Sequence, residues 1–533
     1  MSVLLNLNNR IVISRDDPAF EKTKDLLTIV EKELVVGKEY DSSLGRYKQT
    51  HRTRNVNKYL YDIDKDNLYI PYGIYKYVKY LFKNSDVKYA GIKNHPIMNT
   101  VDVVDNITKY RDILPGISLY DNQLEALRNI FRYKRGTIQA GTGFGKTELM
   151  CASSQILKEL NDGKYPTILV LEPTVELLKG IKKRFREYKI PVNDYRETRM
   201  IFKGKVNLAH PISLCNDLAK DKKMLDKVEV QFIDECHHSQ SLSFSTPTNY
   251  MPNLMYSIGL SATFLSHYHV DGTNIDDFNY EELRRIGACG PIIMKVDGKD
   301  LIKNKQLAVP KLCILSNPAN EEIDEDRIDY TWQNVSKIRL QSEARTKLIA
   351  QAACVFIKYG YKVIILMNLL DWGRRIMTEI YNLGYGDYVR TCFGGQTYEK
   401  INKRTGKLEK EWNSTLTLFD KEKIKCIVGS SSIQEGIDLS KVDVCILGQG
   451  GKSDRTTLQS VGRALRKSKT GKYSWIVDIE DIEDSMLHRQ FDERLIKYKK
   501  VLGLTKDEDV FRNLNPEKLE EIFIQYEELN EAK

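Results

Sequence analysis

Short apolar runs alternate with amphipathic segments through most of the chain. In the runs, Val, Ile and Leu follow one another as in buried strands, and between the runs apolar residues recur at helical spacing. This pattern predicts strands at residues 167–171, 228–233, 362–366, 425–428, 442–447 and 474–477, and helices at 122–131 and 148–160. Strands and helices in alternation predict βαβ units and buried parallel sheets, so we expect an α/β protein.

Changes in the sequence pattern divide the chain into four regions. Residues 1–112 are rich in Tyr, Lys, Asp and Asn, and we expect them to form a small N-terminal α+β domain. The alternation of strands and helices occupies residues 113–305 and again 306–500, which predicts two tandem α/β domains. A turn-prone Lys-Asn-Lys sequence ahead of Pro310 joins them, and residues 501–533 form an acidic tail.

The tail ends in a predicted helix. Nine Asp and Glu residues and three Lys and Arg residues lie between Asp507 and Lys533. Asn515 and Pro516 are typical of a helix start, and residues 517–529 follow with apolar side chains on one face. We expect this helix to dock on the second α/β domain, and a partner-binding site is the alternative.

Basic and aromatic residues are interleaved in the N-terminal region. Eleven Lys and Arg, four Asp and Glu and nine Tyr residues lie between Arg46 and Lys93. This mixture suits phosphate contacts combined with base stacking, so we expect nucleic-acid binding. Tyrosines that only pack and lysines that only face solvent are the alternative. Residues 59–73 predict a hairpin with its turn near 64–67, and a helix should follow near 74–82.

Composition narrows the class of protein. Of the 533 residues, 41% are hydrophobic and 29% are charged, which is typical of a folded globular protein. The net charge of +9 favours a polyanionic partner, although codon bias in an AT-rich genome produces the same excess of lysine. The nine cysteines form no CxxC pair, which favours a reducing compartment and argues against a zinc ribbon or an iron–sulfur cluster.

The sequence predicts neither a targeting segment nor a membrane segment. The first residues lack the basic start and apolar run of a signal peptide, and no stretch reaches about 18 apolar residues. We therefore expect a cytoplasmic protein without membrane contact.

The strongest chemical signal is a glycine-rich loop ahead of a predicted helix. It comprises Ala140, Gly141, Thr142, Gly143, Phe144, Gly145, Lys146 and Thr147. Strand, loop and helix in this order are typical of a phosphate-binding loop, in which backbone N–H groups and the helix N-terminus face the phosphates. Lys146 would hold the β- and γ-phosphates, and Thr147 would bind Mg²⁺. Ala140 stands at the first position of the pattern, where glycine is usual.

A second signal lies at the end of the strand predicted at residues 228–233. Asp234 and Glu235 follow that strand directly, and His237 and His238 come next. Acidic residues at a strand end downstream of a phosphate loop suit a magnesium site. Asp234 would hold the metal through water, and Glu235 would deprotonate the attacking water. The two histidines lack sequence neighbours for a metal site of their own.

These residues resemble motifs I and II of the superfamily 2 helicases, with motif II in its DExH form. Further motifs follow in the family's order. Gln123 resembles the adenine-reading glutamine, residues 172–174 resemble motif Ia, and residues 261–263 resemble motif III. Gly436 and Asp438 resemble motif V, and motif VI is matched by Gln459, Arg463 and Arg466. Motif Ib, nearest at residues 212–217, and motif IV, near 364–368, are poorly marked. The matching motifs span residues of about 117–466.

The resemblance implies two tandem RecA-like parallel-sheet domains that bind ATP and Mg²⁺ between them. Catalysis would involve Lys146, Asp234, Glu235, Gln459, Arg463 and Arg466, and the nucleotide would also contact Gln123, residues 140–147, Gly436 and Asp438. Charge spreads over the γ-phosphoryl oxygens in the transition state, and an arginine can neutralise it. Arg463 and Arg466 would share one helix face for this purpose, and structural salt bridges are the alternative.

The order of the regions resembles the UvsW-type helicases of phages and the XPB-like group. This resemblance implies a DNA helicase or translocase that remodels branched or forked DNA in replication, recombination or repair. We expect a monomeric motor in a bacterial or phage-infected cytoplasm. An RNA helicase and an ATP-gated nucleic-acid clamp or sensor that separates no strands are the alternatives.

An insertion interrupts the second α/β region. Residues 397–418 are rich in Lys, and Thr405 and Gly406 could form the turn of a basic hairpin. Such a hairpin could separate nucleic-acid strands, and a solvated surface excursion is the alternative.

Overall fold

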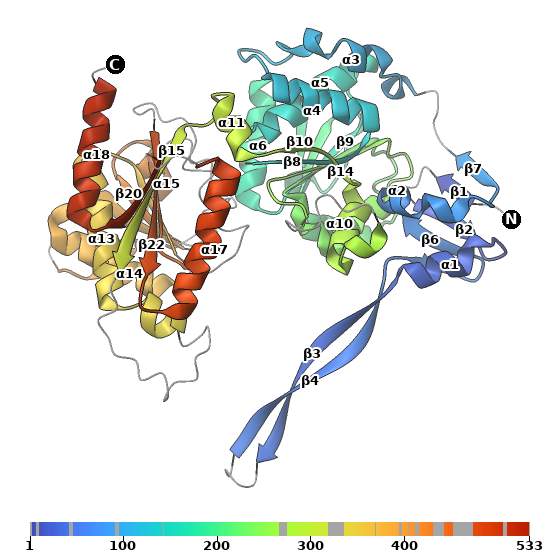
Figure 1. Ribbon diagram of the computed structural model, residues 1–533. Helices are drawn as coiled ribbons and strands as arrows, with labels where there is room; N and C mark the ends of the chain where they lie inside the picture. The colour runs from blue at the N-terminus through green and yellow to red at the C-terminus, as the bar shows by residue number, and fades with distance from the viewer. Residues whose placement is uncertain are drawn as a thin grey trace. The chain divides into compact units, whose positions relative to one another are not determined.

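The protein folds into two compact units. The structure is a computed structural model and describes residues 3–6, 10–41, 46–90, 95–141, 143–265, 274–317, 335–367, 369–393, 397–402, 405–410, 415–429, 442–450, 473–504 and 509–531. One unit comprises residues 1–139 and 146–295, and the other comprises residues 140–145 and 296–533. Each unit is built around a large sheet (Figure 1).

A seven-stranded sheet of order β10-β11-β9-β12-β13-β8-β14 forms the centre of the first unit. Its strands are β8 (Arg135–Ala140), β9 (Ile168–Leu171), β10 (Val192–Asp194), β11 (Val206–Ala209), β12 (Val230–Asp234), β13 (Tyr256–Ser261) and β14 (Ile292–Val296). From β10 to β8 all neighbours run parallel. The strands predicted at 167–171 and 228–233 are confirmed, and their buried residues explain the continuous apolar runs.

Helices cover both faces of this sheet. They include α4 (Asp121–Tyr133), α5 (Lys146–Leu160), α6 (Val175–Glu187), α8 (Pro211–Leu218) and α10 (Tyr280–Cys289). In Figure 1, α4 and α5 lie on one side of the sheet and α10 on the other. The predicted helices at 122–131 and 148–160 are confirmed as α4 and α5. Because β8, β9, β12 and β13 are parallel, their carboxyl ends meet at one edge of the sheet.

The N-terminal region forms a smaller sheet of order β5-β6-β2-β1-β7 in the same unit. Its strands are β1 (Val3–Asn6), β2 (Arg10–Ser14), β5 (Asp62–Ile63), β6 (Asn67–Pro71) and β7 (Val87–Ala90), and α1 (Ala19–Leu26) follows β2. The predicted hairpin is confirmed as β5 and β6. The predicted helix is confirmed as the consecutive turns η1 (Tyr72–Ile74), α2 (Tyr75–Val78) and η2 (Lys79–Phe82).

The small sheet is held against α10 by a close backbone contact. A Cβ added to Gly73 would lie 2.0 Å from the carbonyl oxygen of Ile286, and one added to Gly287 would lie 3.0 Å from Pro71. Real Cβ atoms do not approach backbone oxygens this closely, so Gly73 is required by packing. The small sheet and the seven-stranded sheet therefore form one packed body.

A long two-stranded ribbon extends from the small sheet (Figure 1). It consists of β3 (Thr28–Asp41) and β4 (Arg46–Tyr59), 14 residues each, paired antiparallel from Thr28 opposite Tyr59 to Asp41 opposite Arg46. The sequence pattern did not predict this ribbon. The Glu and Lys residues of β3 break the apolar alternation that identifies a half-buried strand.

A nine-stranded sheet of order β19-β18-β17-β20-β16-β21-β22-β15-β23 forms the second unit. The strands are β15 (Val309–Asn317), β16 (Val363–Leu366), β17 (Val389–Phe393), β18 (Thr397–Ile401), β19 (Leu408–Lys410), β20 (Cys426–Gly429), β21 (Val444–Leu447), β22 (Tyr473–Asp481) and β23 (Val510–Leu514). All four strands predicted in this region are present. The insertion adds the antiparallel hairpin β18–β19 at one edge, with Gly406 at φ +65 in its turn.

Helices α13 (Glu343–Lys358), α14 (Leu370–Ile380), α17 (Ser485–Leu502) and α18 (Pro516–Glu531) belong to the second unit. The tail helix α18 docks here as predicted. Asn515 accepts a hydrogen bond from the backbone of Lys518 at 3.0 Å and so caps the helix. Phe523 is fully buried, and its ring lies 5.4 Å from Trp475 and 5.2 Å from Phe356.

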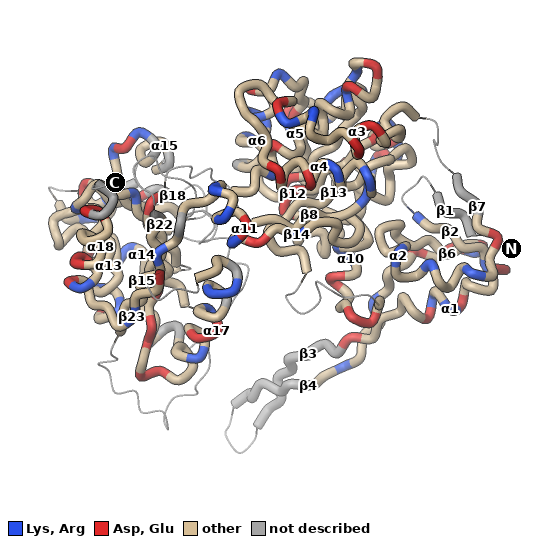
Figure 2. Tube along the Cα trace, turned by 45° about the horizontal axis from the view of Figure 1, so that its top comes forward, with Lys and Arg blue, Asp and Glu red and all other residues tan. Residues whose placement is uncertain are grey.

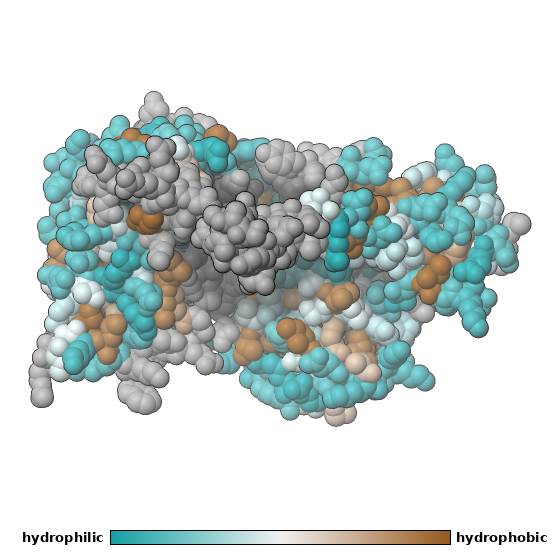
Figure 3. Space-filling model, turned by 90° about the horizontal axis from the view of Figure 1, so that it is seen from below, coloured by the Kyte–Doolittle hydropathy of each residue, from teal (hydrophilic) through white to brown (hydrophobic). Residues whose placement is uncertain are grey.

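Charged residues of both signs are spread along both units (Figure 2). On the face seen in Figure 3, the described residues are mainly hydrophilic, with apolar residues in small separate patches. Among the described residues, the helices are too short or too polar to cross a membrane.

Candidate functional site

The glycine-rich loop connects β8 to α5 in the first large sheet. β8 ends at Ala140 and α5 begins at Lys146, as the phosphate-loop pattern predicts. Gly143 and Gly145 have φ angles of +90 and +88, which side chains rarely adopt, so glycine is needed at both positions. Phe144 is fully buried, and its N–H donates to the carbonyl of Gly141 at 3.3 Å. Thr142 lies outside the described residues.

The predicted acidic pair lies at the carboxyl end of β12. Asp234 is the last residue of the strand and is 5% exposed. Glu235 has a φ angle of +44, in the left-handed region, and its N–H donates to the Asp234 carboxylate at 2.9 Å. A residue other than glycine in this region costs about 1–3 kcal/mol and persists where the surroundings or the function demand it. The turn at Glu235 is therefore a strained feature at a predicted catalytic position.

Lys146 and Glu235 form an ion pair. The Lys146 Nζ and Glu235 Oε1 atoms lie 3.1 Å apart, and both side chains are largely buried. Burial alone would raise the pKa of Glu235, but the Lys146 ammonium and His237 outweigh it and hold this pKa well below its usual range. Burial likewise opposes the Lys146 charge, but Glu235 and Asp234 outweigh it, so the pKa of Lys146 is raised. The structure therefore brings the two predicted catalytic groups together in their charged forms.

A third carboxyl group belongs to this cluster. Glu172 follows β9 directly and is fully buried. Burial, together with the negative charges of Asp234 and Glu235, raises the pKa of Glu172 well above its ordinary value. Residues 172–174 resemble motif Ia, which contacts a nucleic-acid backbone in the family, and that contact stays a prediction; the Glu172 side chain itself is buried beside the acidic pair. Thr174 caps α6 by accepting from the Leu177 N–H at 3.3 Å.

His237 links the acidic pair to the expected motif III. Its side chain is fully buried, and Nδ1 lies 2.8 Å from the Ser261 hydroxyl and 3.3 Å from Glu235 Oε2. Ser261 is the last residue of β13, the strand beside β12. The sequence offered His237 only as the last position of the DExH pattern. The structure gives it a position between the end of β12 and the end of β13.

The oxygen donors near Lys146 fit a magnesium ion. Thr147 lies in the first turn of α5, and Asp234 supplies a carboxylate at the adjoining sheet edge. Hydroxyl and carboxylate oxygens are the donors that Mg²⁺ prefers. These two residues would hold the ion together with phosphate oxygens of a nucleotide. Among the described residues, no group of three or more His, Cys, Asp and Glu side chains forms a separate metal site.

For the remaining predicted site residues, the structure gives a position for Gln123 but does not describe those of motifs V and VI. Gln123 is buried in the first turn of α4, where its side-chain oxygen accepts from the Tyr120 N–H at 2.9 Å. Its contact with adenine stays a prediction. The expected motif V and VI residues Gly436, Asp438, Gln459, Arg463 and Arg466 lie outside the described residues.

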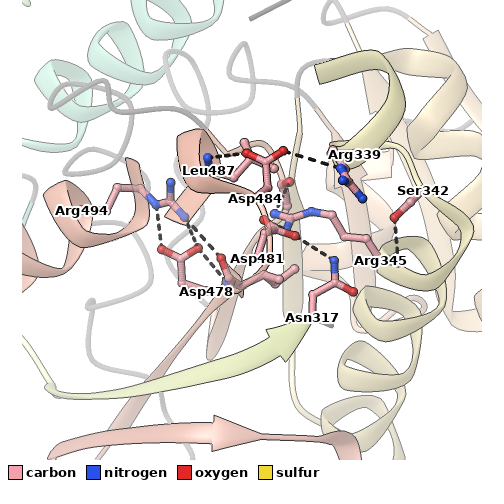
Figure 4. A network of polar contacts seen from close by, with 11 residues as sticks. Asn317, Arg339, Ser342, Arg345, Asp478, Asp481, Asp484, Leu487 and Arg494 are labelled. Carbon is pink, nitrogen blue, oxygen red and sulfur yellow. Dashed lines mark hydrogen bonds and ion pairs between the residues drawn. The ribbon is translucent and has the colours of Figure 1, made fainter. Parts of the chain in front are cut away.

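A buried charge network lies at the end of β22, the strand that follows the expected motif VI (Figure 4). Asp478 accepts from Arg494 at 2.9 and 3.0 Å and from the Tyr498 hydroxyl at 2.8 Å. Asp481 accepts from Arg345 and, at 2.8 Å, from Asn317.

Asp484, three residues further on, caps α17 by accepting from the Leu487 N–H at 2.9 Å. Together these bonds tie β15 and β22 to α13 and α17. The sequence did not reveal this network, because its partners are up to 164 residues apart.

Two family models match the chain. The model described as "Type III restriction enzyme, res subunit" matches residues 116–266, and the model "Helicase conserved C-terminal domain" matches residues 347–468. The first range contains the phosphate loop, the acidic pair and Ser261. The second contains the segments expected to carry motifs V and VI.

Curated relatives include three helicases or translocases. The "DNA 3'-5' translocase XPB2" of Sulfurisphaera tokodaii is 25% identical over 71% of this chain and 86% of its own length. The "ATP-dependent DNA helicase uvsW" of Enterobacteria phage T4 is 22% identical over 65% of each chain. Helicase 22 of a Sulfolobus islandicus filamentous virus is 23% identical over 64% of this chain and 60% of its own. The chain thus spans less than two thirds of the latter two relatives.

Solved structures support the fold. A variant of S. cerevisiae Dbp5 bound to RNA and ADP BeF3 matches with a TM-score of 0.54 at 12% identity, covering 81% of this chain and 98% of that one. The α/β class with tandem RecA-like domains is therefore confirmed. With both family models matched in order, the chain resembles the superfamily 2 helicases and, among them, the UvsW-type members.

Proposed function

We propose that this protein is an ATP-driven DNA helicase or translocase that remodels branched or forked DNA in replication, recombination or repair. The observation that carries the proposal is the cluster at the carboxyl edge of the first large sheet. There Lys146 pairs with Glu235, Asp234 lies beside them, and His237 connects Glu235 to Ser261.

The cluster explains how hydrolysis would be controlled. Mg²⁺, when bound, neutralises phosphate charge and lowers the barrier to phosphoryl transfer. Lys146 is paired with Glu235 at 3.1 Å, and a bound nucleotide would draw its ammonium toward the phosphates. Since that ammonium holds the pKa of Glu235 low, its displacement would raise this pKa. Glu235 would then become a stronger base for the attacking water.

His237 provides a route from hydrolysis to strand movement. Its imidazole contacts both Glu235 and Ser261, so a change at Glu235 alters the bond to the end of β13. Thr263 lies two residues further on, and its N–H donates to the Ser261 hydroxyl at 3.2 Å. This chain of contacts supports coupled hydrolysis more than a clamp that binds without turnover.

DNA is the proposed partner for two reasons. The XPB2 relative is named as a DNA translocase, and the uvsW relative is named as a DNA helicase. The N-terminal sheet also extends a long ribbon, and two-stranded ribbons fit nucleic-acid grooves. An RNA helicase is the second candidate, since the Dbp5 fold relative was solved with RNA. We further propose that the motor works as a monomer encoded by a phage.

Strand displacement tests the proposal. The purified protein is given ATP and a labelled four-way DNA junction, a DNA fork, a blunt DNA duplex or an RNA duplex of matched sequence. Lys146→Ala serves as the blank because it lacks the phosphate-binding ammonium. Faster displacement from the junction and fork than from the blunt duplex is expected. Displacement of RNA alone would favour the RNA helicase, and ATP turnover without displacement would favour a translocase or clamp.

A further inference from the structure

An open pocket lies where the N-terminal sheet meets the first large domain. It is open to solvent, and its volume is about 640 Å³ when the space at its open mouth is included. One wall is the end of β4 with β5 and β6, and the other is α10 with α9 (Leu242–Ser245) and η6 (Pro247–Tyr250). Both walls belong to the same unit. We call this the junction pocket.

Aromatic rings and arginines line the junction pocket. Tyr59, the last residue of β4, is 52% exposed, and its ring lies 5.5 Å from Tyr61 in an edge-on arrangement. The Tyr280 hydroxyl donates to the Tyr59 carbonyl at 3.3 Å and so ties α10 to the base of the ribbon. Arg284 lies 5.7 Å from the Tyr280 ring and donates to the Ser245 hydroxyl at 2.9 Å.

We propose that the junction pocket binds one unpaired nucleotide of a nucleic-acid strand. Tyr59 would stack on the base and Arg284 would attract the phosphate. This rests on the proposed function, which it deepens by naming where a displaced strand is held. Tyr59 is 52% exposed, so a base can reach its side chain from solvent, and every nucleobase has a π-face that stacks on aromatic rings. Arg10 is already paired with Asp62 at 3.2 Å, whereas Arg284 has no carboxylate partner in the part of the chain that the structure describes.

The position of the pocket favours a strand over a free small molecule. Its α9 wall follows η5 (Cys236–Gln240), which begins one residue after Glu235. Phe244 of α9 stacks on His238 of η5 with ring centres 5.8 Å apart. Leu242, also in the wall, is 70% exposed, and Ile212 of the neighbouring α8 is 55% exposed. A strand that crosses these exposed residues would contact elements next to the acidic pair.

Binding of a single-stranded oligonucleotide to the full-length protein tests this proposal. The readouts are fluorescence anisotropy of the labelled oligonucleotide and quenching of a 2-aminopurine placed within it. Tyr59→Leu removes the ring but keeps an apolar side chain. It should weaken binding by about 5- to 150-fold, the range expected for loss of one base-stacking contact, and abolish most of the quenching. Tyr133→Leu is the control, because Tyr133 is also 52% exposed and lies at the end of α4 outside the pocket.

Arg284 gives an independent arm of the test. Arg284→Gln should lower the slope of log affinity against log salt concentration by about 0.7, as expected for one lost phosphate contact to a single strand, and Arg284→Lys should restore it. Unchanged affinity, quenching and salt slope in both Tyr59→Leu and Arg284→Gln would overturn the pocket while leaving the proposed function intact. Equal losses on a blunt duplex would also overturn it, because no base is unpaired there. A wild-type protein that binds no nucleic acid would overturn both proposals.

Discussion

Single residues at the edge of the first sheet would carry the proposed chemistry. Glu235 is strained at φ +44, paired with Lys146 and touched by His237, so its charge responds to each neighbour. The grouping of Lys146, Asp234 and Glu235 in one site could be predicted from the sequence, because each follows an apolar strand at a characteristic spacing. The burial of Glu172 and the bond from His237 to Ser261 could not, because they depend on how neighbouring strands align.

Replacement of Glu235 by Gln should separate binding from turnover. The amide keeps the size of the side chain but cannot accept a proton from water, so ATP hydrolysis should fall by about 10²- to 10⁴-fold. Binding of a fluorescent ATP analogue should stay within a few-fold of wild type. A variant that no longer binds the analogue would show instead that Glu235 supports the structure of the site.

His237 and Ser261 should act as a coupled pair. His237→Asn and Ser261→Ala each remove the same 2.8 Å contact, so the double variant should lose little beyond either single one. The measured quantity is DNA-stimulated ATP turnover across the four proteins of this cycle, and the expected coupling energy is about 0.5–3 kcal/mol. Strictly additive effects would mean that the contact does not transmit hydrolysis to motif III.

Among the elements, those with continuous apolar runs were predictable and those held by distant contacts were not. β9, β12 and β16 stand where the pattern placed them, because full burial demands an uninterrupted apolar sequence. α18 stands where predicted because its apolar residues recur at helical spacing. The ribbon β3–β4 escaped prediction, since each strand has only one partner and carries charged residues. The network at Asp478 and Asp481 escaped as well, because charged side chains in a sequence give no sign of burial.

The close contact between η1 and α10 can be tested by a substitution at Gly73. Gly73→Ala would place a Cβ 2.0 Å from the Ile286 oxygen, and overpacking of this kind costs about 1–3 kcal/mol. Thermal unfolding should therefore begin at a lower temperature. Gly180→Ala is the matched control, because it lies in α6 with no heavy atom within 4 Å of the new Cβ and should be neutral or stabilising. Equal melting temperatures for the two variants would argue against the docked arrangement.

At the scale of the whole molecule, the segments that match the helicase family models are accompanied by additions outside those matches. The two family models together cover every strand of the first large sheet except β14, and the second large sheet except β15, β22 and β23. The N-terminal sheet, its ribbon and the tail helix lie outside both matches. We expect these additions to decide which nucleic acid the motor remodels.

The exposed lysines of the N-terminal region should contribute to DNA binding. Charge reversal of Lys76, Lys79 and Lys83 to Glu should weaken DNA binding and flatten its salt dependence. For each lysine–phosphate contact that is lost, one fewer counterion is released from the DNA on binding. Lys164, Lys183 and Lys189 are exposed in the first large domain, and their reversal is the matched control. Titration of labelled DNA at several salt concentrations gives both quantities. Equal behaviour of the two triple variants would indicate a protein-interaction module in place of a DNA-binding one.

The most direct test of the account is ATP turnover by the purified protein, with Lys146→Ala as the blank. Turnover is compared without nucleic acid, with single-stranded DNA, with a four-way DNA junction and with structured RNA. Turnover should be abolished in Lys146→Ala and stimulated by DNA, most strongly by the junction. Turnover that persists in Lys146→Ala, or that responds to none of the three polynucleotides, would contradict it.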